Sequence, residues 1–587
     1  MGKLYIAEKP SVAELLAQTL GGAKKTQTHW TTAGGDSVTW ALGHLVSLYD
    51  PEDYNPAWRS WNPAQLPMLP EKFKWKPADV GSAQRLKDIA GVINQTQPTS
   101  IVNACDAGRE GELIFWLIWA ELKLEGKVPM ERLWLRSMTP EGINKALTDV
   151  KPGAEFRNLA VAAASRAMAD WVVGMNGTRA CSNILSGGKK EVWSVGRVQT
   201  PTLAVLVDRA VERETHVPVE SWALAGTFTI GGSQFEASAP STAETAEPTS
   251  QTLAGTSGTV QDTITQESRP PFKLFDLTTL QRYMNITAGW TAQRTLDAAQ
   301  KLYEHEKVIT YPRTESDALP ADYEKEAQRV LDALPAQGFG KFTSLALPAN
   351  ACPHKELIFD DKAVTDHFAI IPTGIPLNSK VADHQALYAT IVKRFIAAFC
   401  PAEVVEVKKR TVTMPDGTVF SAQLETTVTP GWKAVYGRSA GSQKGMPLPG
   451  ESGQPATASK VTPVKSVSQP PPLHNEATLL EAMSKDKSKS LGTAATRASV
   501  IENLKRKEYI KPSGGSWEPT PKGMKLVTEL RTRGLGELTN ADLTGTWEGR
   551  LRGIEKGTEK ATSFNSDMKQ LAAGVVGKLK ATPPSIS

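Results

Sequence analysis

The first 150 residues alternate between short apolar runs and amphipathic segments. Residues 4–7 form an apolar run, and apolar positions at helical spacing follow it. Residues 101–120 repeat this order, with a polar turn at 106–112 between the two parts. Repeated strand–turn–helix units predict an α/β domain with a largely parallel sheet over residues 1–150.

The rest of the chain changes its periodicity several times. The pattern is helical over 151–217, strand-like over 218–275, helical over 276–400, strand-like over 401–472 and helical over 473–587. A helical insertion therefore splits the strand-like sequence, whose second part carries a hairpin turn signal at Asp416-Gly417. A stretch rich in Ser, Thr, Ala and Pro, 239–258, is expected to be an exposed loop.

Composition narrows the class of protein. The chain has 587 residues, too many for one small domain, and its 40% hydrophobic and 22% charged residues exclude a largely disordered chain. The longest apolar run, 113–120, is far shorter than the roughly 20 residues that cross a bilayer, so we expect no membrane span. Glu8 and Glu14 interrupt the apolar region that a signal peptide needs, so we expect a cytoplasmic protein. Four cysteines without a C-x-x-C pair support neither a disulfide framework nor a zinc ribbon. The net charge of +5 permits a polyanionic partner without requiring one.

The polar turn at 106–112 carries acidic residues at the end of a predicted strand, where open α/β sheets place their sites. Asp106 and Glu110 are four residues apart, so a helical turn brings them to one face. Glu8, at the end of the first strand, could complete a site for a hard cation such as Mg²⁺. The alternative is a solvated acidic helix N-terminus, favoured by the helix dipole.

Other polar positions are weaker signals when each is taken alone. Tyr311 stands in an extended segment with Arg313 two residues on, which suits an assisted nucleophile but also a tyrosine packed at a strand end. Arg166 and Asp170 are spaced for a helical surface ion pair. A lone His367 is more often structural than catalytic.

Together, these motifs resemble type IA DNA topoisomerases, specifically the bacterial topoisomerase III branch. The resemblance covers nearly the whole chain and depends on the order of the motifs. They include IAEKPS at 6–11, DAGREGE at 106–112, SVGRVQTPTLAVL at 194–206, LYEHEKVITYPRTES at 302–316, DHFAIIPT at 366–373 and LTGTWE at 543–548. DAGREGE alone indicates only a Toprim fold, whereas ITYPRTES together with SVGRVQTP is specific to type IA enzymes.

The resemblance implies a multidomain α/β and α+β fold. An N-terminal Toprim α/β domain would join a ring that has a β-rich arch and helical winged-helix-like domains. The implied parts are the Toprim domain at 1–150, the helical DNA-binding core at 151–217 and 473–587, the arch at 218–275 and 401–472, and the tyrosine-containing winged-helix-like domain at 276–400.

The resemblance also implies roles for five catalytic residues. Tyr311 would attack a DNA phosphodiester and form a 5′-phosphotyrosyl enzyme. Arg313 would stabilise the phosphate, and Glu8 and Lys9 would assist proton transfer and religation at the 3′ oxygen. His367 would hold the cleaved strand in the same network.

The acidic motif departs from the family pattern at one position. The family usually has Asp-x-Asp-x-Glu, and Gly108 stands in place of the middle Asp. This leaves Glu8, Asp106 and Glu110 to hold Mg²⁺, with Glu112 as a further candidate.

The expected partner is single-stranded or negatively supercoiled DNA. Residues at family positions that grip a single strand are His44, Trp61, Arg166, Asp170, Ser194, Gly196, Arg197, Gln199, Thr496 and Arg497. Trp61 would stack on a base, although a core role is an alternative. The chain lacks a G-x-x-x-x-G-K-[ST] motif, so ATP is not expected to drive the reaction.

The resemblance therefore predicts an ATP-independent, monomeric topoisomerase that relaxes negative supercoils and decatenates DNA at the nucleoid. A helicase or a single-strand-binding protein is a candidate partner. The stretch 239–258 lacks the basic residues expected of a decatenation loop. An alternative is a single-stranded DNA-binding remodelling protein that is catalytically weakened by Gly108. A Toprim nuclease or primase is a third hypothesis, but it leaves Tyr311 and the split strand-like sequence unexplained.

Overall fold

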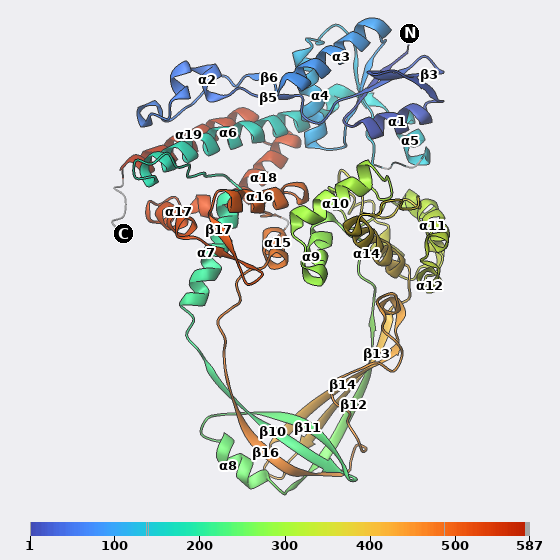
Figure 1. Ribbon diagram of the computed structural model, residues 1–587, viewed down its shortest axis with the longest axis vertical. Coiled ribbons are helices and arrows are strands. Elements are labelled where there is room, and N and C mark those ends of the chain that lie inside the picture. The colour runs from blue at the N-terminus through green and yellow to red at the C-terminus, as the bar shows by residue number, and fades with distance from the viewer. Residues whose placement is uncertain (1, 137, 139, 487, 582–587) are drawn as a thin grey trace.

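A computed structural model describes residues 2–136, 138, 140–486 and 488–581. The chain forms a ring (Figure 1). The N-terminal domain lies at one end of the long axis, the strands of an arch lie at the other, and helical domains lie between them on both sides of an opening.

The N-terminal domain is built on a sheet of mixed direction. Its central strands β4 (Ser37–Trp40), β1 (Leu4–Ala7), β7 (Ile101–Ala104) and β8 (Met130–Arg132) are parallel, and β2 (Ala23–Lys25), β3 (His29–Thr32) and β9 (Lys151–Pro152) are antiparallel edges. Every residue of β1 and β7 is buried, as expected for central strands of a sheet covered on both faces. The covering helices are α1 (Pro10–Thr19), α3 (Val80–Thr96), α4 (Arg109–Glu121) and α5 (Pro140–Thr148). The largely parallel α/β sheet is confirmed.

A long helical core joins this domain to the rest of the ring. Helix α6 (Arg157–Leu185) lies along α19 (Ala561–Ala581), and small alanines on α6 allow the close approach (Figure 1). The other core helices are α7 (Gln199–Glu214), α15 (Glu476–Ser484), α16 (Ala494–Arg506), α17 (Pro521–Thr532) and α18 (Ala541–Glu555). A short hairpin, β17 (Ile510–Ser513) with β18 (Ser516–Pro519), was not predicted from the sequence.

The inserted helical domain carries Tyr311. Its main helices are α9 (Leu277–Ala288), α10 (Ala292–Glu304), α11 (Glu324–Ala333) and α14 (Ala382–Ala398), and its short ones are α12 (Gly340–Thr343) and α13 (Lys355–Ile358). Leu280, Leu296 and Phe395 belong to its buried core.

The arch is one antiparallel sheet made from two separate parts of the chain. Its strands are β10 (Glu220–Ile230), β11 (Ser233–Ser241), β12 (Ser257–Arg269), β13 (Glu403–Thr413), β14 (Val419–Thr429), β15 (Gln443–Lys444) and β16 (Pro455–Val467). A single pairing of Ser238 with Ser421 joins β11 to β14, so the sheet curls back on itself. The turn predicted at Asp416-Gly417 connects β13 to β14, with Gly417 at positive φ.

Two ribbons of paired strands connect the arch to the rest of the ring. On one side, β10 pairs with β16 down to Glu220 opposite Val467. On the other side, β12 pairs with β13 down to Arg269 opposite Glu403. Both strands of the second ribbon continue into the tyrosine-bearing domain, so both of its covalent connections to the rest of the chain run through the arch.

The prediction that 239–258 forms an exposed loop is wrong. Helix α8 (Ala246–Leu253) occupies its centre, and Ala246, Ser250 and Leu253 are buried against the arch. These positions follow i, i+4, i+7 spacing, which packs one helical face. Its Ser and Thr content hid this short apolar face.

The four cysteines are buried and form no disulfide. Among the described helices, none combines the length and apolar character needed to cross a membrane.

Glu476 gives a pH-dependent contribution to the stability of the ring. Its Oε1 accepts a hydrogen bond of 2.8 Å from the backbone N of Ala292, where α15 meets α10. Burial raises the pKa of Glu476 to about 6 from 4.5. A carboxyl group whose pKa is higher in the folded than in the unfolded state favours folding while it is protonated, and this contribution is lost as the pH rises through the folded pKa. Above pH ~6, ionised Glu476 therefore lowers the free energy of unfolding by about 2 kcal/mol.

We therefore expect Glu476→Gln, which keeps the acceptor, to be more stable than the wild type by about 2 kcal/mol at pH 7. The difference should shrink as the pH falls through 6 and vanish near 4.5. Denaturant unfolding across this pH range measures it. Glu537→Gln removes an exposed carboxylate and should show no such trend. A constant difference at all pH values would refute the assignment.

Candidate active site

Two neighbouring strands carry the acidic residues to one edge of the N-terminal sheet. β1 and β7 are parallel and in register, with Ala7 opposite Ala104. The chain beyond each strand therefore leaves the sheet at the same edge. Glu8 and Lys9 follow β1, and Asp106 follows β7.

Lys9 lies at the centre of this cluster. Its Nζ contacts Asp106 Oδ2 and lies 3.5 Å from Glu8 Oε1. Burial alone would lower the pKa of Lys9, but the charges of Asp106 and Glu8 raise it above its usual value. Lys9 is therefore a cation throughout the physiological pH range.

The two carboxyl groups beside Lys9 differ in their protonation. Burial and the charge of Asp106 raise the pKa of Glu8 to about 7. Burial also opposes ionisation of Asp106, but the hydrogen bond and charge of His367, 3.1 Å away, and the charge of Lys9 outweigh it and lower the Asp106 pKa. Near neutral pH, Asp106 is an anion, whereas Glu8 readily exchanges a proton.

Tyr311 reaches this cluster from the inserted domain. Its segment is fixed by a hydrogen bond of 3.0 Å from Thr310 N to Ile371 O. The Lys9 ammonium lies 3.8 Å from the centre of the Tyr311 ring, and the His367 ring centre lies 4.4 Å from it. Burial raises the pKa of Tyr311, although Lys9 opposes this effect, so the resting phenol is neutral.

Arg313 lies on the same segment with part of its guanidinium unused. Its Nη2 donates to Gln300 Oε1 at 2.8 Å, whereas its Nε is buried and has no hydrogen-bond partner among the residues that the structure describes. A buried, unpaired N–H group is costly unless a ligand satisfies it. Arg313 is therefore equipped to receive an oxyanion.

Gly108 faces a carboxylate from the inserted domain. A Cβ at this position would lie 2.5 Å from Cγ of Asp366, so no side chain fits beside Asp366 as it stands. The carboxylate of Asp366 thus occupies the space that a side chain at 108 would take.

The other predicted metal ligands have protein partners. Glu110 contacts Arg166, and its Oε2 lies 3.3 Å from His44 Nε2. Glu112 is 1% exposed and contacts Arg132, so it is a structural residue of the domain interior. Among the residues that the structure describes, no three acidic, His or Cys side chains converge closely enough to hold a metal ion.

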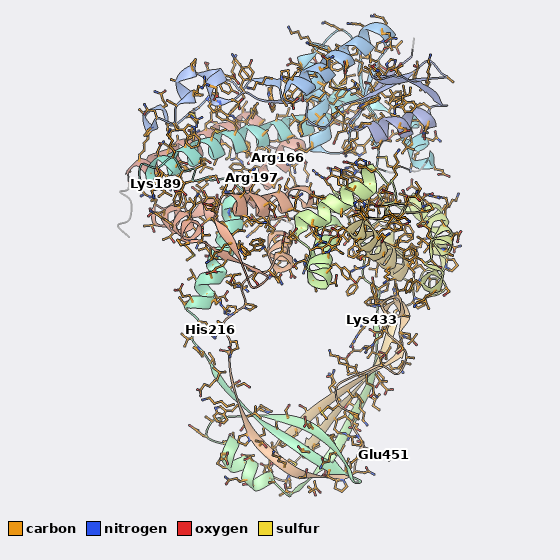
Figure 2. All side chains as sticks on the ribbon, in the orientation of Figure 1. Arg166, Lys189, Arg197, His216, Lys433 and Glu451 are labelled. Carbon is orange, nitrogen blue, oxygen red and sulfur yellow. The ribbon has the colours of Figure 1, made fainter. Side chains whose placement is uncertain are left out.

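A network of ion pairs connects the N-terminal domain with the helical core. Arg109 contacts Glu548 at 2.9 Å and Glu555 at 2.6 Å. Arg197 contacts Asp170 at 2.9 Å and Glu548 at 3.2 Å. Figure 2 shows Arg166 and Arg197 within the helical core, just below α6 in this view. The predicted DNA-binding arginines therefore lie beside the acidic cluster, each held by carboxylates.

The remaining predicted DNA contacts are partly engaged within the protein. Gln199 donates to Ser194 Oγ at 2.7 Å, and Thr496 caps α16. Arg497 is 4% exposed and donates to Thr278 Oγ1 at 2.6 Å, which ties α16 to the tyrosine-bearing domain.

Two further predicted positions differ in their exposure. Gly196 is half-buried, and its backbone N–H donates to Thr200 Oγ1 at 3.0 Å. Trp61 is 41% exposed, with the Arg179 guanidinium 5.2 Å from its ring, so it is not a core residue.

Comparisons with known proteins bear on this arrangement. A family described as DNA topoisomerase matches residues 154–566, and a Toprim domain matches residues 3–134. DNA topoisomerase 3 of Shouchella clausii is 35% identical, with 99% of this chain and 81% of that protein covered. DNA topoisomerase 3 of Bacillus subtilis is 33% identical, with 98% and 82% covered.

This chain belongs to the DNA topoisomerase family. The resemblance to type IA enzymes of the topoisomerase III branch is confirmed. The full-length topoisomerase I structure from Thermotoga maritima has the same fold, with a TM-score of 0.70 at 21% identity, covering 98% of this chain and 90% of that one.

Sequence reasoning missed several residues of this topoisomerase site. Asp366 and Arg109 stand beside His367 and Glu110 in motifs that were singled out, yet neither was assigned a role. Glu548 ends the motif LTGTWE and holds both Arg109 and Arg197. A charged residue inside an otherwise recognised motif was the available signal in all three cases.

Proposed function

We propose that the enzyme is an ATP-independent type IA topoisomerase that cuts one DNA strand through Tyr311, passes another strand and religates the first. The observation that carries this proposal is the meeting of Tyr311 with Lys9, Asp106 and His367 across two domains. A nucleophile on one domain and its charged partners on another allow the cut ends to separate while both stay bound.

The residues of the site can account for each bond change. The Tyr311 oxygen attacks phosphorus, the bond from phosphorus to the 3′ oxygen breaks, and a 5′-phosphotyrosine forms. Glu8, with its raised pKa, accepts the phenol proton, and Lys9 supplies a proton to the departing 3′ oxygen. The unpaired Nε of Arg313 stabilises the charge on the phosphate. Religation reverses these transfers.

The arginines of the ion-pair network would guide the single strand to Tyr311. Arg166 and Arg197 are paired with Glu110 and Asp170 in this structure. DNA phosphates would take over these guanidinium groups, and His44 and Gln199 would contact the same strand. The buried Arg497 would act only by holding α16 against the tyrosine-bearing domain. Phosphate binding releases counterions, so affinity should fall as salt rises.

The carboxylates at the sheet edge have the donor chemistry that Mg²⁺ prefers. Mg²⁺ is usually held by one or two carboxylates, with water and phosphate oxygens completing its shell, so a full protein cage is not required. Glu8 and Asp106 would hold the ion, and Glu110 could join them after leaving Arg166. When bound, the ion supplies positive charge for the DNA phosphates.

Restoring the usual aspartate at position 108 should impair the enzyme. In Gly108→Asp, the new side chain would collide with Asp366 and add a like charge, so we expect adduct formation to fall about tenfold or more. Gly108→Asp combined with Asp366→Gly removes the collision and should recover most activity. Oligonucleotide cleavage by both variants tests this, and a fully active single variant would contradict it.

The function itself is tested by trapping cleavage products with denaturant. A single-stranded oligonucleotide labelled at either end is incubated with and without Mg²⁺, and relaxation of negatively supercoiled plasmid is followed in parallel. We expect the protein on the fragment downstream of the cut and a free 3′-OH on the other. Strand binding without any adduct would instead support a catalytically weakened remodelling protein.

We further propose that the enzyme acts as a monomer at the nucleoid in the cytoplasm, on DNA that a helicase or single-strand-binding protein has opened. One chain already supplies both halves of the site, since Lys9 and Tyr311 meet within it. Where two DNA molecules are linked through single-stranded regions, the same strand passage would separate them, so the enzyme would decatenate DNA as well as relax it.

A further inference from the structure

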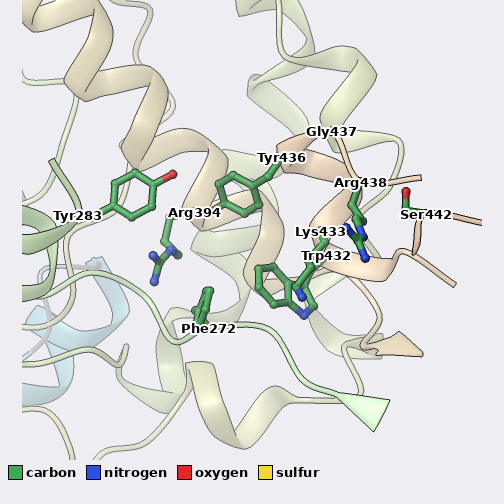
Figure 3. Close-up of a pocket in the computed structure, with 9 residues that line it drawn as sticks. All are labelled: Phe272, Tyr283, Arg394, Trp432, Lys433, Tyr436, Gly437, Arg438 and Ser442. Atoms are coloured by element: carbon green, nitrogen blue, oxygen red, sulfur yellow. The ribbon is translucent and has the colours of Figure 1, made fainter. Parts of the chain in front are cut away.

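A cavity of about 520 Å³ lies where the arch meets the tyrosine-bearing domain. Phe272 comes from the segment after β12, Arg394 from α14, and Lys433 and Tyr436 from the 3₁₀ helix Gly431–Tyr436, and Arg438 follows this helix (Figure 3). Figure 2 shows Lys433 at the edge of the ring opening. None of the residues that line the cavity belongs to the site described above.

Exposed aromatic rings line this cavity. Phe272 is 58% exposed and Tyr436 is 38% exposed. Both are supported from behind by Trp432, whose ring centre lies 4.7 Å from that of Phe272 and 6.1 Å from that of Tyr436. Trp432 is itself fixed, because its indole N–H donates to Arg269 O at 3.0 Å. Trp432 therefore holds both rings in place, and the Arg394 guanidinium lies 5.0 Å from the centre of the Phe272 ring, beside this aromatic surface.

The charge at the cavity is positive. Arg394 lies 4.0 Å from the centre of the Phe275 ring, and Arg438 donates to Thr427 Oγ1 at 2.9 Å. Neither has a carboxylate partner among the residues that the structure describes. Lys433 contacts the buried Glu403 at 2.6 Å. No acidic residue is among those that line the cavity.

We propose that this cavity binds one unstacked nucleotide of a DNA single strand at the rim of the ring opening. The base stacks on Phe272 or Tyr436, and the phosphate lies near Arg394 and Arg438. Aromatic faces beside a cationic groove are the usual means of holding single strands without sequence preference. A base pair inside a duplex has no free face for such stacking. The inference rests on the proposed function, because it assigns the nucleotide to the strand that passes through the ring.

Photocrosslinking locates the nucleotide directly. An oligothymidylate that carries 5-iodouracil and is long enough to extend from Tyr311 to the arch is irradiated with the full-length enzyme, and the crosslinked peptides are sequenced. We expect crosslinks at Phe272 or Tyr436. The nucleotide could belong to a DNA strand or be a free nucleotide, and excess thymidine monophosphate distinguishes the two. A site for free nucleotides would bind this competitor and lose its crosslink to the oligonucleotide, whereas a site for a strand would keep the crosslink.

Variants test the energetics of the site. Phe272→Ala and Tyr436→Ala should each weaken binding of the long oligonucleotide about tenfold. Arg438→Gln should reduce the slope of log affinity against log salt by about 0.7. Lys460→Gln removes one exposed positive charge from the arch outside the cavity and should change neither binding nor crosslinking.

The outcomes separate this inference from the function itself. Absence of any Tyr311 adduct in the wild type would refute the proposed function. A normal adduct without crosslinks at the cavity, or variants that bind the long oligonucleotide as the wild type does, would overturn the nucleotide site alone.

Discussion

Tyr311→Phe is expected to abolish covalent capture of DNA, with a loss of at least about 10⁴-fold in adduct formation. Phenylalanine keeps the ring that packs against Lys9 and His367, so the fold and the affinity for single strands should be unchanged. Only the attacking oxygen is lost. Denaturant-trapped cleavage of an end-labelled oligonucleotide measures the loss, and a parallel binding assay confirms that the strand is still held.

The neighbouring Tyr303 supplies a matched control. Its ring centre lies 5.3 Å from that of Tyr311, and its hydroxyl lies 3.1 Å from Ser11 Oγ. Tyr303→Phe removes the hydroxyl group of the neighbouring ring and leaves Tyr311 intact, so this variant should still form the adduct. A residual adduct in Tyr311→Phe that disappears in the double variant would show that Tyr303 is the nucleophile.

Lys9→Met is expected to lower both cleavage and religation by about 10²–10³-fold. The ammonium neutralises Asp106 and lies over the Tyr311 ring, so its removal takes away a positive charge beside the nucleophile and the proposed proton donor to the 3′ oxygen. Methionine keeps the length and packing of the side chain. Single-turnover cleavage and resealing of a preformed adduct measure the two directions separately.

Lys3→Met is the control for this change. Lys3 lies at the start of the same strand and pairs with Glu131 at 2.5 Å, away from the cluster. Lys3→Met should leave the rates of cleavage and of resealing close to those of the wild type. If Lys9→Met and Lys3→Met behave alike, Lys9 has no direct role in the chemistry.

The sequence was most informative where local pattern and chemistry coincide. Buried parallel strands appear as short apolar runs, so β1 and β7 were predictable, and with them the edge where Glu8 and Asp106 meet. The resemblance then identified Tyr311, although nothing local shows that it lies against Lys9, which is 302 positions earlier in the chain. Helix α8 was missed because its buried face is short.

Side-chain partners were the least predictable features. Arg166 and Asp170 have the spacing of an ion pair on one helix, yet Arg166 contacts Glu110 and Asp170 contacts Arg197. Tertiary contacts outweighed the local i, i+4 preference, which stabilises a helix by only about 0.2–0.5 kcal/mol. Similarly, Gly108 looked like the loss of a carboxylate, and only the fold shows Asp366 lying over it.

The two ribbons of the arch have a mechanical consequence. A pull on the tyrosine-bearing domain reaches β12 and β13 at the same end of the pair, where Arg269 lies opposite Glu403. Both strands are then under tension in the same direction, so the load does not unzip their ladder. The β10–β16 ribbon receives the reaction force in the same manner through Glu220 and Val467. The two ribbons can therefore bend elastically under load while the hydrogen bonds between their strands stay intact.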